Sequence, residues 1–323
     1  MRSIQTSYTF SLSSVKPLDG LLSYRAYCLE ATRRALGGKV HRRERSPVDG
    51  MPLEPFGTME GFSYARCPQS GSLFLSDLPD AATWASLLAE VNRYRHSPDA
   101  FHVGLAQSRT DNIYAPKITW IQDTLRLQEL MHPKVLEVAT PPSDFTTLLR
   151  ESGVFADVET VDEMEIAAHA ARRDDRRRVD VAVLLESLDR VDDPAALLRG
   201  VAGCLASGGL LFITALVCSG FDMAVLGLRN LYLYPPDRAN CFSLRGLEQL
   251  LTRSGFSLLE ASTPGVLDVE IVKAHLQREP SLPLSPFERQ LLNANSETHE
   301  TFQTFLQQRG LSSFARIVGR KRP

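Results

Sequence analysis

The sequence predicts an α/β protein built on a mainly parallel, doubly wound sheet, and two observations in its second half support this fold class. Three runs are almost continuously apolar: KVLEVAT from Lys134, VDVAVLL at 179–185 and GLLFITAL at 209–216. Strands covered on both faces have this composition, which is typical of parallel sheets. Segments with helical character separate the runs, at 145–152, 163–172 and 194–206. Strands that alternate with helices in this way form a sheet with helices on both faces.

The first half predicts helices and a small β ribbon. Apolar residues at helical spacing over 21–36 end before two glycines, a common helix stop. The short alternating runs GFSYARC (61–67) and GSLFLS (71–76) are expected to pair as an antiparallel ribbon. Residues 81–95 and 118–131 predict helices, and we expect a connector between them.

The C-terminal third predicts further helices and a last strand. SLRGLEQLLTRSGF (243–256) is expected to be a helix with Ser243 as its N-cap and a glycine stop. After a proline-rich break at 279–286, a helix and the strand SFARIVGR follow. We therefore expect a helical segment (1–40), a ribbon-like subdomain (41–80), a helical connector (81–133), the α/β domain (134–278), and a C-terminal helix and strand that complete the sheet (279–323).

Composition and charge argue against several classes of protein. The 323 residues are 43% hydrophobic and 23% charged, with a net charge of −2, so no global field attracts nucleic acid or an anionic membrane. The five scattered cysteines form no C-x-x-C pair, which favours a reducing compartment. The N-terminus lacks an apolar stretch long enough for a signal peptide, and the longest apolar run has nine residues, 210–218. We expect a cytoplasmic protein with neither nucleic-acid nor membrane partners.

The strand from Lys134 and the loop after it carry a family resemblance. KVLEVAT followed by PPSDFTTLL resembles the first motif of class I S-adenosylmethionine-dependent methyltransferases, in which an acidic residue precedes a G-x-G-x-G loop. The segment 179–214 resembles the fourth strand, its helix and the fifth strand of that family, with Gly208 and Gly209 retained. Residues 219–256, 262–272 and 302–323 resemble members that have a zinc-ribbon-like N-terminal region. The resemblance covers roughly residues 40–323 and implies a Rossmann-like methyltransferase fold.

The resemblance also suggests which residues would contact the methyl donor. By family position these are Glu137, Ala139, Asp162 and Glu186. The glycine positions of the loop hold Ala139, Pro141 and Ser143. Glycine permits a sharp turn and close approach to a ligand, whereas proline removes an N–H and fixes φ. We therefore expect the loop to be a poor cradle for the amino-acid part and the ribose of the donor. Glu137 is also compatible with a plain polar residue at a strand end.

Asp162 follows the second strand and has two interpretations. It lies nineteen residues after Ser143 (162 − 143), the spacing expected of an acid that binds ribose hydroxyls. It is also a candidate helix N-cap. The next strand begins near Asp180, eighteen residues later (180 − 162), and a βαβ unit needs about 30 residues. The third strand of the family's sheet is therefore expected to be missing or shortened.

Two short stretches resemble the halves of a four-thiolate zinc ribbon. They are SPVDG (46–50) and CPQSG (67–71), and only Cys67 occupies one of the four ligand positions. One thiolate cannot form a tetrahedral Cys₄ site. We expect a degenerate, metal-free ribbon that binds no zinc and is held by aromatic side chains instead, namely Phe56, Phe62, Tyr64 and Phe74.

These departures lead to a first functional hypothesis. The chain keeps the features that build the fold but departs from the family at the ribbon cysteines, the loop glycines and the shortened segment after Asp162. Since the fold needs none of these, we expect a non-catalytic partner or regulatory subunit without a cofactor. Its partner would be a homologous, intact methyltransferase subunit or a second copy of the chain.

The second hypothesis is an active methyltransferase that uses S-adenosylmethionine through an atypical donor loop. The resemblance implies a small-molecule, sugar or nucleotide-sugar substrate in surface-glycan or secondary metabolism. Candidate substrate-side residues lie in the stretch LYLYPPDRAN (231–240): Tyr232, Tyr234, Asp237, Arg238 and Asn240. The alternative interpretation of this stretch is a structured loop with two core tyrosines. Glu186 and Asp189 could share a helix face near the donor sulfonium, or be surface acids. Arg190 stands where many members have histidine, so no role is transferred to it.

Overall fold

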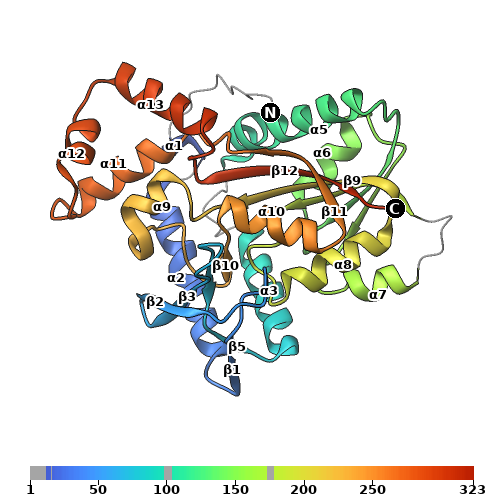
Figure 1. The fold of residues 1–323 in the computed structure, drawn as a ribbon, viewed down its shortest axis with the longest axis horizontal. Helices are drawn as coiled ribbons and strands as arrows, with labels where there is room; N and C mark the ends of the chain where they lie inside the picture. Colours follow the sequence, from blue (N-terminus) through green and yellow to red (C-terminus); the bar gives the residue numbers. More distant parts are fainter. Residues whose placement is uncertain (1–11, 16, 98–103, 173–177) are drawn as a thin grey trace.

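The computed structural model describes residues 12–15, 17–97, 104–172 and 178–323. Its largest element is a six-stranded sheet in the order β11-β12-β9-β8-β6-β7 (Figure 1). The strands are β6 (Lys134–Val138), β7 (Asp157–Val161), β8 (Val179–Leu185), β9 (Leu205–Leu216), β11 (Phe256–Ser262) and β12 (Phe314–Lys321). β6 to β9 are parallel, and β12 lies antiparallel between β9 and β11. The sheet is therefore mixed but mostly parallel.

Helices cover both faces of this sheet, as Figure 1 shows. α5 (Ala115–Leu127) and α6 (Asp144–Glu151) pack on one face, where Trp120 and Phe145 join the buried core around Phe212. α7 (Ile166–Ala171), α8 (Pro194–Cys204) and α10 (Leu244–Arg253) cover the other, around Leu198 and Leu250. Successive residues of β8 and β9 alternate between the two cores, as strand geometry requires. The predicted doubly wound α/β fold is confirmed.

β7 forms one edge of the main sheet. It pairs with β6 alone, and the described residues contain only α7 between β7 and β8. Within the described part of the chain, no further strand lies between β7 and β8, which agrees with the expectation that the third strand is missing or shortened. α7 begins at Ile166, later than the start at Glu163 that the sequence predicted.

A second, smaller sheet precedes the α/β part in sequence. It contains β2 (Glu54–Met59), β3 (Phe62–Arg66), β4 (Leu73–Leu75) and, from much later in the chain, β10 (Asn240–Cys241). β3 and β4 pair antiparallel, so the expected pairing of their two runs is confirmed. β1 (Val40–Arg42) pairs separately with β5 (Asp77–Pro79). Because the fourth strand of this sheet, β10, comes from the C-terminal half of the chain, the ribbon is part of the same folded unit as the α/β part.

Three of the four aromatic residues expected to hold the ribbon are buried, and the fourth is not. Phe62, Tyr64 and Phe74 are each at most 4% exposed, whereas Phe56 is 41% exposed. The expectation for Phe56 was wrong because of the local geometry of β2. The strand register shifts between Pro55 and Gly57, and Gly57 lies directly against the Leu228 side chain.

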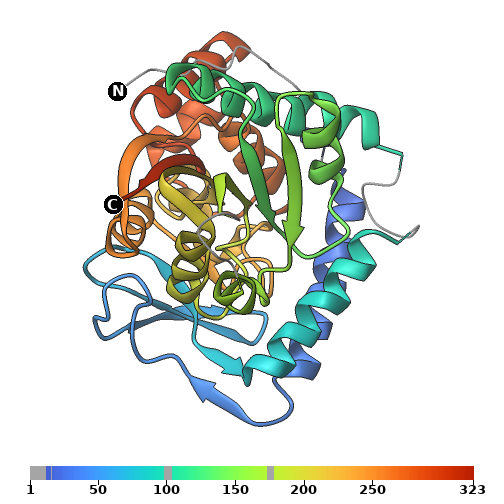
Figure 2. The ribbon, with the colours of Figure 1, turned by 90° about the vertical axis from the view of Figure 1, so that its right-hand side faces the viewer.

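Two helices of the N-terminal half lie side by side, in blue and cyan in Figure 2. They are α2 (Leu18–Ala35) and α3 (Ala81–Arg95), and the rings of Tyr27 and Tyr94 stack between them with centroids 3.8 Å apart. α3 has the predicted bounds, and the Asp80 carboxylate caps it by accepting from the Thr83 N–H. The predicted connector is partly helical, with α4 (Ala106–Arg109) and the π-helical turn η1 (Thr110–Tyr114).

Short helices near the C-terminus pack around a further small core that includes Val269 and Val272. The remaining helices are α1 (Leu12–Val15), α9 (Phe221–Leu226), η3 (Gly227–Arg229), α11 (Asp268–Arg278), α12 (Pro286–Leu292) and α13 (Ser296–Gln308). As expected, Ser243 caps α10, accepting from the Gly246 N–H. Among the described residues, no helix has the length and apolar character needed to cross a membrane.

Candidate functional site

A cavity of about 200 Å³ lies at the carboxyl ends of β6 and β8, and we call it the first cavity. Glu137 and Ala139 line it from the end of β6, and Glu186 lines it just after β8. Asn92 and Arg95 reach it from α3. In open α/β sheets, ligands bind at the carboxyl ends of the strands, so the position of this cavity favours a binding site.

The structure brings most of the sequence-predicted site residues together at this cavity. Glu137, Ala139 and Glu186, expected on the donor side, line it together with Tyr232, Tyr234 and Asp237, expected on the substrate side. Asp162, Asp189 and Asn240 do not line it, and Asp162 lines a separate pocket beside Thr140 and Pro141. The structure shows where these residues lie, and their roles stay predictions.

The loop after β6 takes its shape from neighbouring elements. The Asn92 side-chain amide, on α3, donates to the Thr140 carbonyl (3.1 Å) and the Pro141 carbonyl (3.0 Å). The Ala139 N–H donates to the Val161 carbonyl at the end of β7 (2.9 Å), and the Pro141–Pro142 peptide bond is cis. α3 and β7 therefore hold a loop that contains no glycine.

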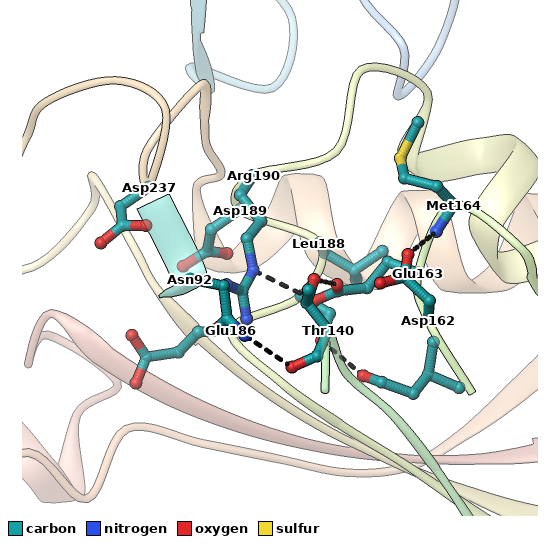
Figure 3. Close-up of polar contacts among 12 residues, drawn as sticks. Asn92, Thr140, Asp162, Glu163, Met164, Glu186, Leu188, Asp189, Arg190 and Asp237 are labelled. Carbon is teal, nitrogen blue, oxygen red and sulfur yellow. Dashed lines mark hydrogen bonds and ion pairs between the residues drawn. The ribbon is translucent and has the colours of Figure 1, made fainter. Parts of the chain in front are cut away.

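A buried ion pair lies beside this loop, as Figure 3 shows. Arg190 Nε is 3.1 Å from Glu163 Oε1, and the other oxygen of that carboxylate accepts from the Thr140 hydroxyl. The Glu163 side chain is fully buried and that of Arg190 is 10% exposed. Sequence reasoning did not single out Glu163, because a neighbouring acid stood at the expected spacing. The pair ties the end of β7 to the segment after β8.

Asp162 caps a turn instead of facing the first cavity. Its carboxylate accepts from the Met164 N–H at 2.8 Å (Figure 3), and its carbonyl accepts from the Glu165 N–H. α7 begins only at Ile166, so the capped turn precedes the helix and Asp162 is not the N-cap of α7. Partial burial raises the pKa of the Asp162 carboxyl, although the bond from Met164 opposes this.

Glu137 is almost fully enclosed at the end of β6. It is 2% exposed, and its carboxylate accepts from the hydroxyls of Ser143 and Thr146. Burial raises the pKa of this carboxyl, and the two hydroxyls oppose the rise. Glu137 therefore joins the strand end to the start of α6.

Glu186 leaves β8 in an unusual backbone conformation. Its φ is +62°, which residues other than glycine, asparagine and aspartate seldom adopt, and its N–H donates to the Thr214 carbonyl (2.8 Å). Its carboxylate forms an ion pair with Arg238 and lies 4.0 Å from the Lys117 ammonium. A strained backbone at a strand end that faces a cavity is typical of functional sites.

Asp189 is fully buried and does not line the first cavity. Its carboxylate accepts from the Leu216 N–H (3.0 Å) and lies 3.4 Å from Arg238. Burial raises the pKa of Asp189 to about 8. Residues 186–189 form a bend and a turn. The expectation that Glu186 and Asp189 share a helix face was therefore wrong.

On the substrate side, Asp237 is the centre of a buried polar cluster. It accepts from the Tyr24 hydroxyl (3.0 Å) and from Arg95 (2.7 Å). Although burial opposes ionisation, Arg95 and two further arginines lower the pKa of the Asp237 carboxyl. Asn240 does not belong to this cluster, because it is fully buried and its side-chain amide donates to the carbonyls of Leu188 and Val191. It is a structural brace and was wrongly expected on the substrate side.

A second cavity, of about 170 Å³, adjoins the first. Lys117, Glu186, Tyr232 and Arg238 line both cavities. The walls that belong to the second cavity alone are mostly apolar and include Leu216, Pro264, Val266, Ile271 and Phe314. The cluster of shared residues thus forms a boundary between a polar and an apolar space.

The stretch SPVDG and its counterpart CPQSG form two turns of the same kind. The Gly50 N–H donates to the Ser46 carbonyl and the Gly71 N–H to the Cys67 carbonyl, both at 2.8 Å, and both glycines have φ of +76°. The Cys67 thiol donates to the Asp49 carboxylate (3.3 Å to Oδ2). In the described part of the chain, no group of three or more His, Cys, Asp or Glu residues could hold a metal ion.

Comparison with known proteins gives one sequence match to a family. Residues 110–261 match a family model described as a methyltransferase domain. No curated protein matches the chain.

The chain is also similar to several solved structures at low sequence identity. One is the 1,6-didemethyltoxoflavin-N1-methyltransferase of Burkholderia thailandensis with bound 1,6-didemethyltoxoflavin and S-adenosylhomocysteine (13% identity, 84% of this chain, 100% of that chain, TM-score 0.44). Another is an S-adenosylmethionine-dependent methyltransferase of Mesorhizobium loti (17% identity, 62% and 96%, TM-score 0.35). A third is the complex of the Haloferax volcanii Trm112 methyltransferase activator with a methyltransferase (15% identity, 60% and 83%, TM-score 0.37).

The sheet order, the cavity at the carboxyl ends of β6 and β8, and the family match agree with one another. The matched residues begin at η1 and end within β11, so they include all four parallel strands. Residues 110–261 therefore match a methyltransferase domain, and the sheet to which they contribute has the α/β Rossmann-like fold.

Proposed function

We propose that the protein is an S-adenosylmethionine-dependent methyltransferase that acts on a small molecule through an atypical donor loop. One observation carries this proposal. The first cavity gathers Glu137, Ala139 and Glu186 from the donor side and Tyr232 and Tyr234 from the substrate side, although these residues span almost a hundred positions. The adjoining second cavity supplies a space for the acceptor.

The side chains around the first cavity fit the amino-acid part of the donor. That part carries a carboxylate and an ammonium group, and the cavity is lined by Arg109 and by the acids Asp144 and Glu186. Ala139 presents only a small side chain. The nucleoside part would meet a different environment from the family pattern, because Asp162 lies in the neighbouring pocket. When bound, the donor supplies a methyl group on a sulfonium.

The chain's own residues at the boundary of the two cavities would hold the acceptor. Methyl transfer depends mainly on positioning two reactants, with a general base where the acceptor must lose a proton. Tyr232 and Arg238 orient the acceptor, since both line both cavities. Glu186 accepts the proton, because its carboxylate lies at the same boundary and is held by Arg238.

A second candidate is a non-catalytic partner or regulatory subunit without a cofactor. The donor loop favours it, since Pro141 and Pro142 offer no N–H and two loop carbonyls are already engaged by Asn92. The partner would then be a homologous intact methyltransferase or a second copy of the chain. The Haloferax volcanii complex shows one methyltransferase with a separate activator.

Calorimetry with S-adenosylmethionine and S-adenosylhomocysteine separates the two candidates. The proposal predicts binding at about micromolar dissociation constants, and Ala139→Leu should abolish it because the larger side chain fills the first cavity. Ala171→Leu, at an exposed helix end, is the matched control and should bind normally. An absence of heat and of a thermal shift at millimolar ligand would leave only the non-catalytic role.

We also propose that residues 41–80 are a metal-free remnant of a zinc ribbon. Two turns with matching hydrogen bonds and matching glycine φ values, joined by the Cys67–Asp49 contact, support this. The five-part division of the chain, the cytoplasmic location, the lack of nucleic-acid and membrane partners, and the link to sugars, nucleotide sugars or surface glycans stay predictions.

A further inference from the structure

Arg316 is a buried cation on the wall of the second cavity. It is 5% exposed, stacks over the Trp120 ring at 5.2 Å, and donates from Nη2 to the Pro116 carbonyl at 3.4 Å. Its Nε finds no hydrogen-bond partner among the described residues. Burial lowers the pKa of Arg316 to about 10, which still leaves the guanidinium charged at neutral pH.

No carboxylate of the described chain pairs with Arg316 within 4.0 Å. The nearby acid is Glu260, whose Oε1 already accepts from Trp120 Nε1 (3.2 Å) and from the Ser262 hydroxyl (3.1 Å). Glu260 is thus a counter-charge beyond ion-pair distance, and it compensates the buried Arg316 cation only in part. An anionic ligand that contacts the guanidinium would complete this compensation.

Asp268, an acid on the wall of the second cavity, is already hydrogen-bonded. Its carboxylate accepts from the Ser312 and Ser313 hydroxyls, the Ser313 N–H and the Gln303 amide. It therefore joins α11 to α13 and to the start of β12, and it forms no ion pair with Arg316 within 4.0 Å. The space around Arg316 is otherwise mostly apolar.

The two cavities differ in which residues they share. Arg316 lines the second cavity only, whereas Glu186 and Tyr232 line both. A ligand held by its charge at Arg316 would place its other end towards the boundary with the first cavity. A planar guanidinium on the wall of a cavity suits a carboxylate, which can accept two parallel N–H bonds from it.

We propose that the second cavity binds an acceptor that has a small apolar body and one carboxylate, with the carboxylate paired to Arg316. The apolar walls hold the body, and the reacting end lies at Glu186 and Tyr232. The statement that this end of the ligand reacts rests on the proposed function. The binding of the carboxylate itself does not depend on a methyl donor.

The test is calorimetry of the full chain with octanoate and with 1-octanol, which has the same length and no charge. Octanoate should bind at least about tenfold more tightly, since charge-assisted hydrogen bonds contribute that much. Arg316→Met should remove this preference while leaving octanol binding unchanged. Arg320→Gln is the control, because Arg320 lies on the same strand and lines neither cavity.

Thermal unfolding of the ligand-free proteins distinguishes a ligand site from a structural arginine. Arg316→Met should keep or raise the midpoint, because a buried charge that is compensated only in part is replaced by an apolar side chain. Arg316→Lys, which retains the charge, should retain part of the octanoate preference. Equal affinities of the wild-type chain for octanoate and octanol, or an octanoate preference that survives in Arg316→Met, would overturn the proposal.

The outcome is separable from that for the proposed function. If the chain binds octanoate through Arg316 but does not bind S-adenosylhomocysteine, the anion site stands and the proposed methyltransferase function is rejected. If the chain binds S-adenosylhomocysteine but does not bind octanoate, the proposed methyltransferase function stands and the carboxylate-bearing substrate class is rejected.

Discussion

Charged side chains buried near the first cavity lie mostly in pairs, and at the scale of single residues these pairs define the site. Glu163 faces Arg190, and Asp237 faces Arg95. Each pair joins elements that are distant in sequence. Removing one member leaves the other as an uncompensated buried charge, which costs more than the pair contributes.

The Glu163–Arg190 pair gives the first prediction. Arg190→Met should lower the free energy of unfolding by about 3 kcal/mol, because it leaves the Glu163 carboxylate buried without its charge partner. Adding Glu163→Gln should recover much of this loss, since the amide still accepts from the Thr140 hydroxyl. Urea denaturation at pH 7 measures both. Additive losses in the double variant would contradict the coupling.

Asp189 gives a prediction about pH. Burial raises its pKa to about 8, whereas an unfolded aspartate titrates near about 3.9. Between these values the folded chain holds a proton that the unfolded chain has released, so stability falls as pH rises through this window. Asp189→Asn retains an acceptor for the Leu216 N–H and removes the titration.

The measurement for Asp189 is urea denaturation of both proteins at pH 5 and pH 8. The loss of stability between the two values should be smaller in Asp189→Asn. Asp222, with a pKa raised to about 7 by burial and by nearby Asp268, contributes equally to both proteins and cancels in the comparison. An unchanged loss would show that Asp189 is ionised in the folded chain at pH 5.

At the scale of elements, local sequence signals predicted most strands and helices from Lys134 onward. β6, β8 and β9 are apolar runs, and α10 has its serine cap, so each carries its own signature. β11 was missed because it offers no such pattern. After Phe256, its residues Ser257, Leu258 and Leu259 are exposed in succession, without alternation.

The candidate site was predictable only in part, for the same reason. Glu137 and Glu186 stand at strand ends, where position alone points to the cavity. Asn92, Arg95 and Lys117 reach the cavity from α3 and α5, and nothing in their local sequence indicates this. Asp162 had the expected spacing, but the chain turns after β7 and places Glu163 inward instead.

The two turns of the ribbon give a prediction for one element. Hydrogen bonds from Gly50, Gly71 and Cys67 close the turns, so the ribbon should not need a metal. EDTA should therefore leave the thermal midpoint unchanged, and elemental analysis of the purified protein should find no stoichiometric zinc. One equivalent of zinc, or a midpoint lowered by EDTA, would contradict the metal-free ribbon.

At the scale of the whole molecule, the N-terminal elements complete the site of the α/β part. α2 and α3 bring Tyr24 and Arg95 to the first cavity, and β10 binds the small sheet to the segment after β9 (Figures 1 and 2). The matched methyltransferase domain covers only residues 110–261. Residues on both sides of it thus shape the two cavities, which explains why the domain motif alone does not reveal the substrate.

The most direct test of the proposed function is a crystal structure of the protein with S-adenosylhomocysteine. The account predicts the ligand in the first cavity, in contact with Ala139 and near Glu186 at the boundary with the second cavity. A ligand bound elsewhere, or a first cavity that holds only water at millimolar S-adenosylhomocysteine, would contradict it.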